Sequence, residues 1–115
     1  MTTPIVFFDI AGPDLAAQSG FYSAVFGWEV GPGGSLTLDV QKPLTGLLRV
    51  DPAERVLYLG VPDISATLSD VVAHGGQVVA PRFEVPGRVV LGLFTDPAGN
   101  RMGLVEMDGD TARIP

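Results

Sequence analysis

The chain contains two copies of one sequence segment, related by a shift of 49 residues. Both copies, at residues 13–30 and 62–79, open with Pro-Asp and carry a glycine at the same later position. The identical pairs are Pro13/Pro62, Asp14/Asp63, Ala17/Ala66, Ala24/Ala73, Gly27/Gly76 and Val30/Val79. Two copies of one supersecondary unit predict a pseudo-twofold molecule, and we expect a ligand to bind between the copies.

The length and composition exclude several classes of protein. A chain of 115 residues forms one domain with one modest core, so the two copies must share their buried surface. No apolar run approaches the roughly 18 residues of a membrane span, and we identify no signal peptide, so we expect a cytoplasmic protein without membrane contact. The absence of cysteine excludes thiolate chemistry. A net charge of −6 without a basic segment argues against nucleic-acid binding.

Hydrophobic periodicity predicts the order strand, helix and three strands in the first half. Asp14 is placed to cap a helix from Leu15 to Phe26, and Gly27 to end it. Strands are expected at residues 4–10, 28–30, 35–40 and 45–50.

The second half repeats this order. Asp63 is placed to cap a helix from Ile64 to about His74. Strands are expected at residues 55–61, 77–80, 88–95 and 101–107, with Pro81 and Pro86 bounding a connector. We therefore expect one domain over residues 1–107, with βαβββ modules at about 4–50 and 55–107, and a poorly ordered tail at 108–115.

Several short motifs, taken in order, resemble one known superfamily. They are FFDI before Asp14, Phe21-Tyr22, Phe26-Gly27-Trp28, Tyr58 before Val61-Pro62-Asp63, Gly75-Gly76, and Asp96-Pro97-Ala98-Gly99-Asn100 before Leu104-Val105-Glu106. Over residues 4–107 the chain resembles the vicinal oxygen chelate superfamily, which includes glyoxalase I, extradiol dioxygenases and bleomycin-resistance proteins. The resemblance implies an α+β fold of two paired βαβββ modules, which form a curved antiparallel sheet around a cleft. It also implies a homodimer.

The resemblance places the metal ligands of the superfamily's enzymes on strands, but this chain departs from that pattern. The residues at the usual histidine positions are Phe7 and Val56, seven residues before Asp14 and Asp63. Glu106 matches the strand-terminal glutamate of the superfamily. One carboxylate does not hold a metal against water, so we expect neither a metal nor another cofactor.

Five residues are candidates for the cleft: Phe7, Asp9, Trp28, Tyr58 and Glu106. Asp9 shares a strand face with Phe7, and the 49-residue shift relates it to Tyr58. The alternative for Asp9 is a turn-stabilising role at the strand end.

Two of these candidates also have structural alternatives. Glu106 shares a face with Met102 and Leu104, and there a carboxylate needs a partner or a raised pKa. Its alternative is a salt bridge with Arg49 or Arg101. Trp28 can instead pack between the halves. The one histidine, His74, is expected to face solvent at a helix end.

The favoured hypothesis is a metal-independent protein that binds a small organic molecule in the cleft between modules, with Asp9 and Glu106 favouring a cationic ligand. One alternative is a metal-dependent lyase, isomerase or dioxygenase with a degenerate site, in which these two acids hold Mg²⁺ or Mn²⁺ weakly. Another is an interaction module whose bulky side chains fill the cleft. The fold alone cannot choose among these hypotheses, so the site residues must.

Overall fold

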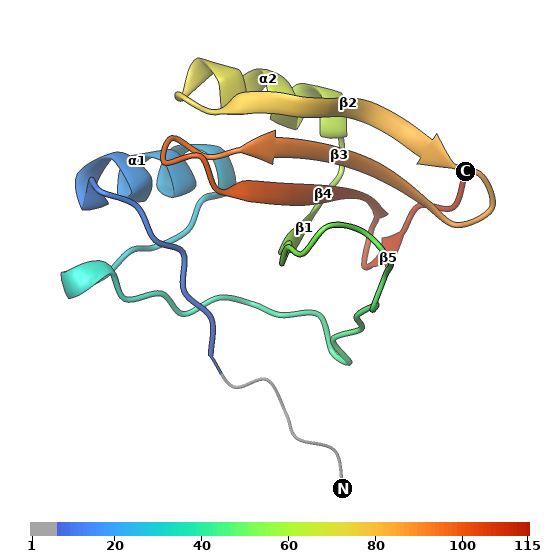
Figure 1. Cartoon of the computed structure of the whole chain (residues 1–115), viewed down its shortest axis with the longest axis horizontal. Coiled ribbons are helices and arrows are strands. Elements are labelled where there is room, and N and C mark those ends of the chain that lie inside the picture. Colours follow the sequence, from blue (N-terminus) through green and yellow to red (C-terminus); the bar gives the residue numbers. More distant parts are fainter. Residues whose placement is uncertain (1–6) are drawn as a thin grey trace, which may run out of the picture.

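A computed structural model describes residues 7–115 as an α+β domain (Figure 1). Helix α1 spans Leu15–Phe26 and helix α2 spans Ile64–Ala73. In each helix the N-cap carboxylate, of Asp14 or Asp63, accepts a hydrogen bond of 3.0 Å from the amide three residues later. Gly27 ends α1 at a φ of 69°, a conformation that glycine adopts without steric cost. Both predicted helices are confirmed.

Within residues 7–115, five strands form one mixed sheet. They are β1 (Tyr58–Val61), β2 (Gln77–Val85), β3 (Val89–Thr95), β4 (Arg101–Asp108) and β5 (Thr111–Ala112). The order is β1-β4-β3-β2, and β5 pairs with β4. The sequence predicts an antiparallel sheet, but the crossover through α2 brings β1 parallel to β4. The other neighbouring strands are antiparallel.

The second half has the predicted βαβββ order, with one strand longer than expected. Strand β2 continues through Pro81 to Val85, where the sequence predicts a connector after residue 80. Proline is tolerated there because β2 is an edge strand, so a missing N–H need not break a ladder.

The first half does not form the predicted strands. Residues 35–50 contain no strand, and Leu36 makes an isolated antiparallel bridge with Val30 after a short 3₁₀ turn at Pro32–Gly34. The strand predicted at 4–10 lies partly outside the described residues, and residues 7–10 are not in a strand. A strand requires a hydrogen-bonded neighbour, and among the described residues the segment 35–50 has no pairing beyond the bridge of Leu36 with Val30. Within residues 7–115, the described strands form one βαβββ unit, and the first predicted module is represented by helix α1 without its strands.

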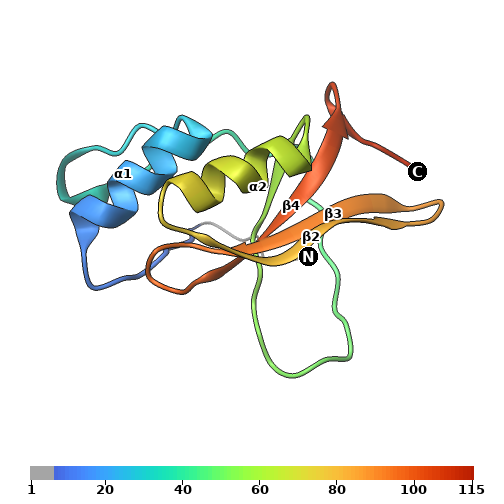
Figure 2. The same cartoon turned by 90° about the horizontal axis from the view of Figure 1, so that it is seen from above.

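The two halves share one hydrophobic core, as the chain length predicts. Both helices lie on one side of the sheet, and the segment leading into β1 loops out on the other side (Figure 2). Phe21 of α1 lies against Phe94 of β3, with ring centroids 6.1 Å apart. The buried apolar residues are Phe21, Tyr22, Val61, Ile64, Leu68, Val71, Val90, Phe94, Met102 and Leu104.

The C-terminal tail is held against the sheet, so the expectation of a poorly ordered tail is wrong. Strand β5 pairs with the end of β4. The Arg113 amide donates to the Glu106 carbonyl at 2.9 Å, and the Gly87 amide to the Pro115 carbonyl at 3.1 Å. These long-range backbone bonds have no periodic signal in the sequence.

Candidate functional site

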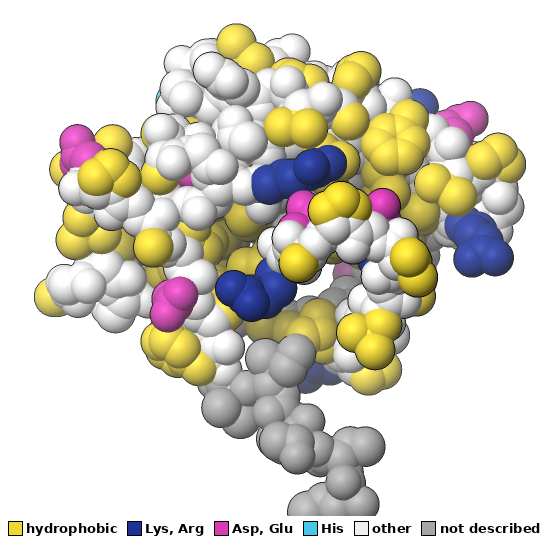
Figure 3. All heavy atoms as spheres, in the orientation of Figure 1, with side chains coloured by type: hydrophobic (Ala, Val, Ile, Leu, Met, Phe, Trp, Pro, Cys, Tyr) yellow, Lys and Arg dark blue, Asp and Glu magenta, His cyan; other side chains and the backbone are white. Residues whose placement is uncertain are grey.

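The two faces of the sheet differ in exposure. On β3 and β4 one set of alternate side chains is buried beneath the helices, and the other set points to the opposite side. We call this opposite surface the open face, and Figures 1 and 3 look onto it. Its residues are Tyr58, Phe83, Leu91, Leu93, Arg101, Gly103 and Val105. Most of this surface is apolar and not covered by a helix.

Tyr58 begins the edge strand β1, and its ring lies over Gly103 of β4 on the open face. It pairs with Gly103 across β1 and β4, and a methyl group on Gly103 would lie 2.3 Å from Tyr58 Cδ1. The absence of a side chain at Gly103 therefore lets the ring rest on the sheet. Tyr58 remains 49% exposed, so one surface of the ring is available for stacking.

The charged groups of the open face come from β4 and from the segment before β1. Arg101 Nε lies 3.7 Å from Glu54 Oε1, and the same carboxylate contacts Arg49. Figure 3 shows basic and acidic side chains meeting near the centre of this view, beside a hollow with hydrophobic side chains on its wall.

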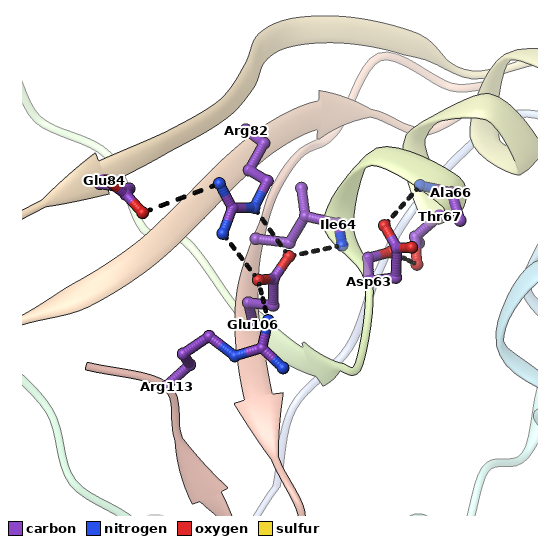
Figure 4. A network of polar contacts seen from close by, with 8 residues as sticks. All are labelled: Asp63, Ile64, Ala66, Thr67, Arg82, Glu84, Glu106 and Arg113. Carbon is purple, nitrogen blue, oxygen red and sulfur yellow. Dashed lines mark hydrogen bonds and ion pairs between the residues drawn. The ribbon is translucent and has the colours of Figure 1, made fainter. Parts of the chain in front are cut away.

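Glu106 lies on the helix side of the sheet and is only 2% exposed (Figure 4). Arg82 donates to both carboxylate oxygens, from Nε at 3.0 Å and from Nη2 at 2.9 Å. The Ile64 amide at the start of α2 donates at 3.1 Å, and Arg113 donates from the tail at 2.9 Å. The partner proposed from the sequence, Arg49 or Arg101, is therefore wrong, although the need for a partner is confirmed.

These contacts keep Glu106 charged. The hydrogen bonds from Arg82 and from the Ile64 amide outweigh the effect of burial and lower the pKa of Glu106 from 4.5 to about 2. Glu106 in turn raises the pKa of Arg82. Four donors occupy the carboxylate, so its role is to join α2, β2 and the tail to β4.

A second buried carboxylate, Asp96, was not identified from the sequence. It accepts hydrogen bonds from Gln18 Nε2 and Tyr22 Oη, each at 2.9 Å, and also from the Asn100 side chain and the amides of Ala98 and Asn100. Burial and the adjacent carboxylate raise the pKa of Tyr22. The available signal was the four-residue spacing of Gln18 and Tyr22, which places two donors on one helix face.

The five predicted cleft residues do not come together. Tyr58 lies on the open face, and Glu106 on the opposite side. Trp28 stacks on Tyr22 with centroids 4.7 Å apart, which is the packing alternative. Phe7 is 78% exposed, and Asp9 is exposed two residues later. His74, as predicted, is the exposed residue that ends α2.

The side chains do not fit the metal site of the superfamily's enzymes. Across residues 7–115, no group of three or more His, Asp or Glu side chains is arranged to hold an ion. Phe7 and Val56 offer no ligand atom, and the Glu106 carboxylate is already bound by two guanidinium groups and an amide.

Neither helix in residues 7–115 has the length and apolar character needed to cross a bilayer.

Comparison with known proteins identifies relatives of this chain. It is 28% identical to the anthracycline biosynthesis protein DnrV of Streptomyces peucetius over 117 aligned residues, which cover 80% of this chain and 42% of DnrV. It is also 28% identical to the putative glyoxylase CFP32 of Mycobacterium tuberculosis, covering 84% and 42% of the two chains. The chain thus spans less than half the length of these curated relatives.

Solved structures share the fold. A glyoxalase-related enzyme from Fulvimarina pelagi superposes with a TM-score of 0.70 at 18% identity, covering 96% of each chain. A hypothetical protein from S. aureus, SA1046, gives 0.68 at 18% identity, covering 93% of this chain and 96% of the other. The sequence model of the glyoxalase-like domain matches residues 5–105. The chain therefore belongs to the glyoxalase-like domain family, within the superfamily that its motifs resemble.

Proposed function

We propose that the chain binds a small organic molecule on the open face without a metal ion. The observation that carries this proposal is the half-exposed Tyr58 ring resting on Gly103 amid apolar side chains. Such a surface offers a flat aromatic ring with apolar side chains around it, a combination that is typical of ligand-binding sites.

The hydrogen bonds that occupy the Glu106 carboxylate support binding without a metal ion. Glu106 is not free to act as the ligating glutamate that the resemblance implies, because its oxygens already accept hydrogen bonds from Arg82, Arg113 and Ile64. Breaking these contacts would leave the buried Glu106 charge without its two guanidinium partners, which is costly.

The relatives' names are consistent with a small organic ligand. DnrV is named for anthracycline biosynthesis and CFP32 as a putative glyoxylase, and both are more than twice as long as the matched segment. The absence of cysteine makes a reducing compartment suitable, and we propose that the protein acts in the cytoplasm.

The test is a thermal-shift titration with a panel of flat aromatic compounds. We expect at least one compound to raise Tm saturably, and to do so equally in EDTA. Tyr58→Ala should abolish this shift, whereas Val72→Ala, at an exposed position of α2, should retain it. If no compound raises Tm, the binding proposal fails; if EDTA removes the shift, metal independence fails.

We also propose that the chain forms a homodimer through the segment before β1. Its side chains at Leu47, Leu48 and Val50 are almost fully exposed, with Leu48 at 99%. Exposed apolar clusters of this kind mark interaction surfaces. Among residues 7–115, β1 pairs only with β4, so its other edge offers further strand groups for pairing.

Sedimentation velocity tests the dimer. The wild-type chain should sediment at twice its 12.0 kDa mass. The double substitution Leu47→Ser and Leu48→Ser should give monomers that keep the wild-type circular dichroism, because neither side chain is buried within the chain. Val72→Ser, at another exposed apolar position, should remain dimeric. A monomeric wild-type protein at micromolar concentration would contradict the proposal.

A further inference from the structure

We infer that the open face selects a ligand with a negatively charged or hydrogen-bond-accepting group beside a flat apolar body, and that Arg101 recognises this group. The inference rests on the proposed binding function and specifies its ligand class. It reverses the cationic preference expected from the sequence.

The first step is the position of Arg101. Along β4, Arg101 precedes Gly103 by two residues, so alternation puts the Arg101 side chain on the face where Gly103 meets Tyr58. Gly103 is the residue on which Tyr58 rests. The Arg101 guanidinium therefore belongs to a residue two positions along β4 from the site of the Tyr58 ring. This places a cation at the edge of a flat surface.

The second step is the availability of the guanidinium. In its ion pair with Glu54, the distance from Arg101 Nε to Glu54 Oε1 is 3.7 Å, which exceeds hydrogen-bond distance. Glu54 is also held by Arg49, which contacts it more closely. The Arg101 side chain is 46% exposed. A ligand carboxylate could therefore take the paired N–H donors that Glu54 does not satisfy.

The third step is that the two acids expected from the sequence to attract a cation, Glu106 and Asp9, do not act at the open face. Glu106 lies on the other side of the sheet, and Arg82 and Arg113 neutralise it. Asp9 is exposed on the segment before α1. The net charge of −6 acts over long range and is screened beyond about 8 Å at physiological ionic strength. The nearby guanidinium therefore decides the preference at the site.

The experiment compares three probes of one shape: 2-naphthoate, 2-naphthamide and 2-naphthylmethylammonium, titrated by calorimetry into the wild-type protein. We expect naphthoate to bind more tightly than the ammonium by about tenfold or more, as for a charge-assisted contact. Naphthamide should bind with intermediate affinity. The advantage of naphthoate should shrink as salt is added.

Four substitutions, one of them a control, identify the group responsible. Arg101→Gln should remove the naphthoate preference, while Arg88→Gln, in the exposed β2–β3 turn, should preserve it. Glu54→Gln should tighten naphthoate binding by removing the competing carboxylate. Tyr58→Ala should weaken all three probes alike.

The outcomes separate the two proposals. Equal affinity for the three probes, tighter ammonium binding, or a naphthoate preference that survives Arg101→Gln would overturn the inference and leave the binding function intact. Failure of every probe and of the wider aromatic panel would overturn both.

Discussion

Glu106 and Arg82 form a two-point contact across the sheet, with both carboxylate oxygens accepting from one guanidinium at 2.9 and 3.0 Å. The two residues come from β4 and β2, which are separated by β3 in the sheet. Arg82 thus spans a strand to reach its partner, and the Ile64 amide fixes the same carboxylate at the start of α2. This contact holds the edge strand and the helix to the centre of the sheet.

The lowered pKa of Glu106 predicts an acid-sensitive contribution to stability. A carboxyl with a pKa of about 2 in the folded chain and 4.5 otherwise binds more protons when unfolded, so stability rises with pH over this interval. The contribution is complete above about pH 5 and is lost as the pH falls through about 2. The free energy of unfolding of the wild-type protein, measured with urea, should therefore decrease progressively as the pH falls from about 5 to about 2.

The matched variant is Glu106→Gln, whose free energy of unfolding should fall less between pH 5 and pH 2 than that of the wild type. It should also be less stable than the wild type at pH 7, because Arg82 and Arg113 lose their charged partner. The control is Asp70→Asn at an exposed site on α2. A variant whose pH dependence equals that of the wild type would show that Glu106 does not supply this effect.

The hydrogen bond between Tyr22 and Asp96 predicts a specific loss of stability. Tyr22→Phe removes a donor 2.9 Å from a buried carboxylate, and should lower the free energy of unfolding by about 1.5 to 3 kcal/mol. The ring, and therefore its stacking on Trp28, is retained. Denaturant unfolding followed by circular dichroism measures the change.

A double-mutant cycle with Asp96→Asn is the control for that prediction. If Tyr22 acts through Asp96, the two losses should not add, because the second substitution finds the contact already weakened. Strictly additive losses would mean that the Tyr22 hydroxyl stabilises the fold by another route.

The helices and the second-half strands were predictable because their signals are local. Asp14 and Gly27 delimit α1 within a few residues, and Asp63 does the same for the start of α2. The strand predicted at residues 35–40 has an alternating pattern, but among the described residues its pairing is limited to the isolated bridge of Leu36 with Val30. Periodicity reports which side chains prefer burial, and it does not report whether a partner strand is present.

The site was predictable only where its signals are local to one strand. Alternation correctly grouped Glu106 with Leu104, but it cannot state which face of a strand meets the helices. Arg82 and Arg113 reach Glu106 through β2 and the tail, and such contacts between distant segments follow only from the assembled sheet. Tyr58 was identified because its position in the repeat corresponds to Asp9.

The contact of Tyr58 with Gly103 predicts that a methyl group added at Gly103 destabilises the protein only when the Tyr58 ring is present. Gly103→Ala places Cβ 2.3 Å from the ring and should destabilise the protein by about 1 to 3 kcal/mol, a range typical of overpacking. In the Tyr58→Ala background the same change should cost little, because the obstructing ring is gone. Gly46→Ala is the control, since a Cβ there meets no atom within 4 Å. Equal cost of Gly103→Ala in both backgrounds, measured by thermal unfolding, would show that Tyr58 does not rest on Gly103.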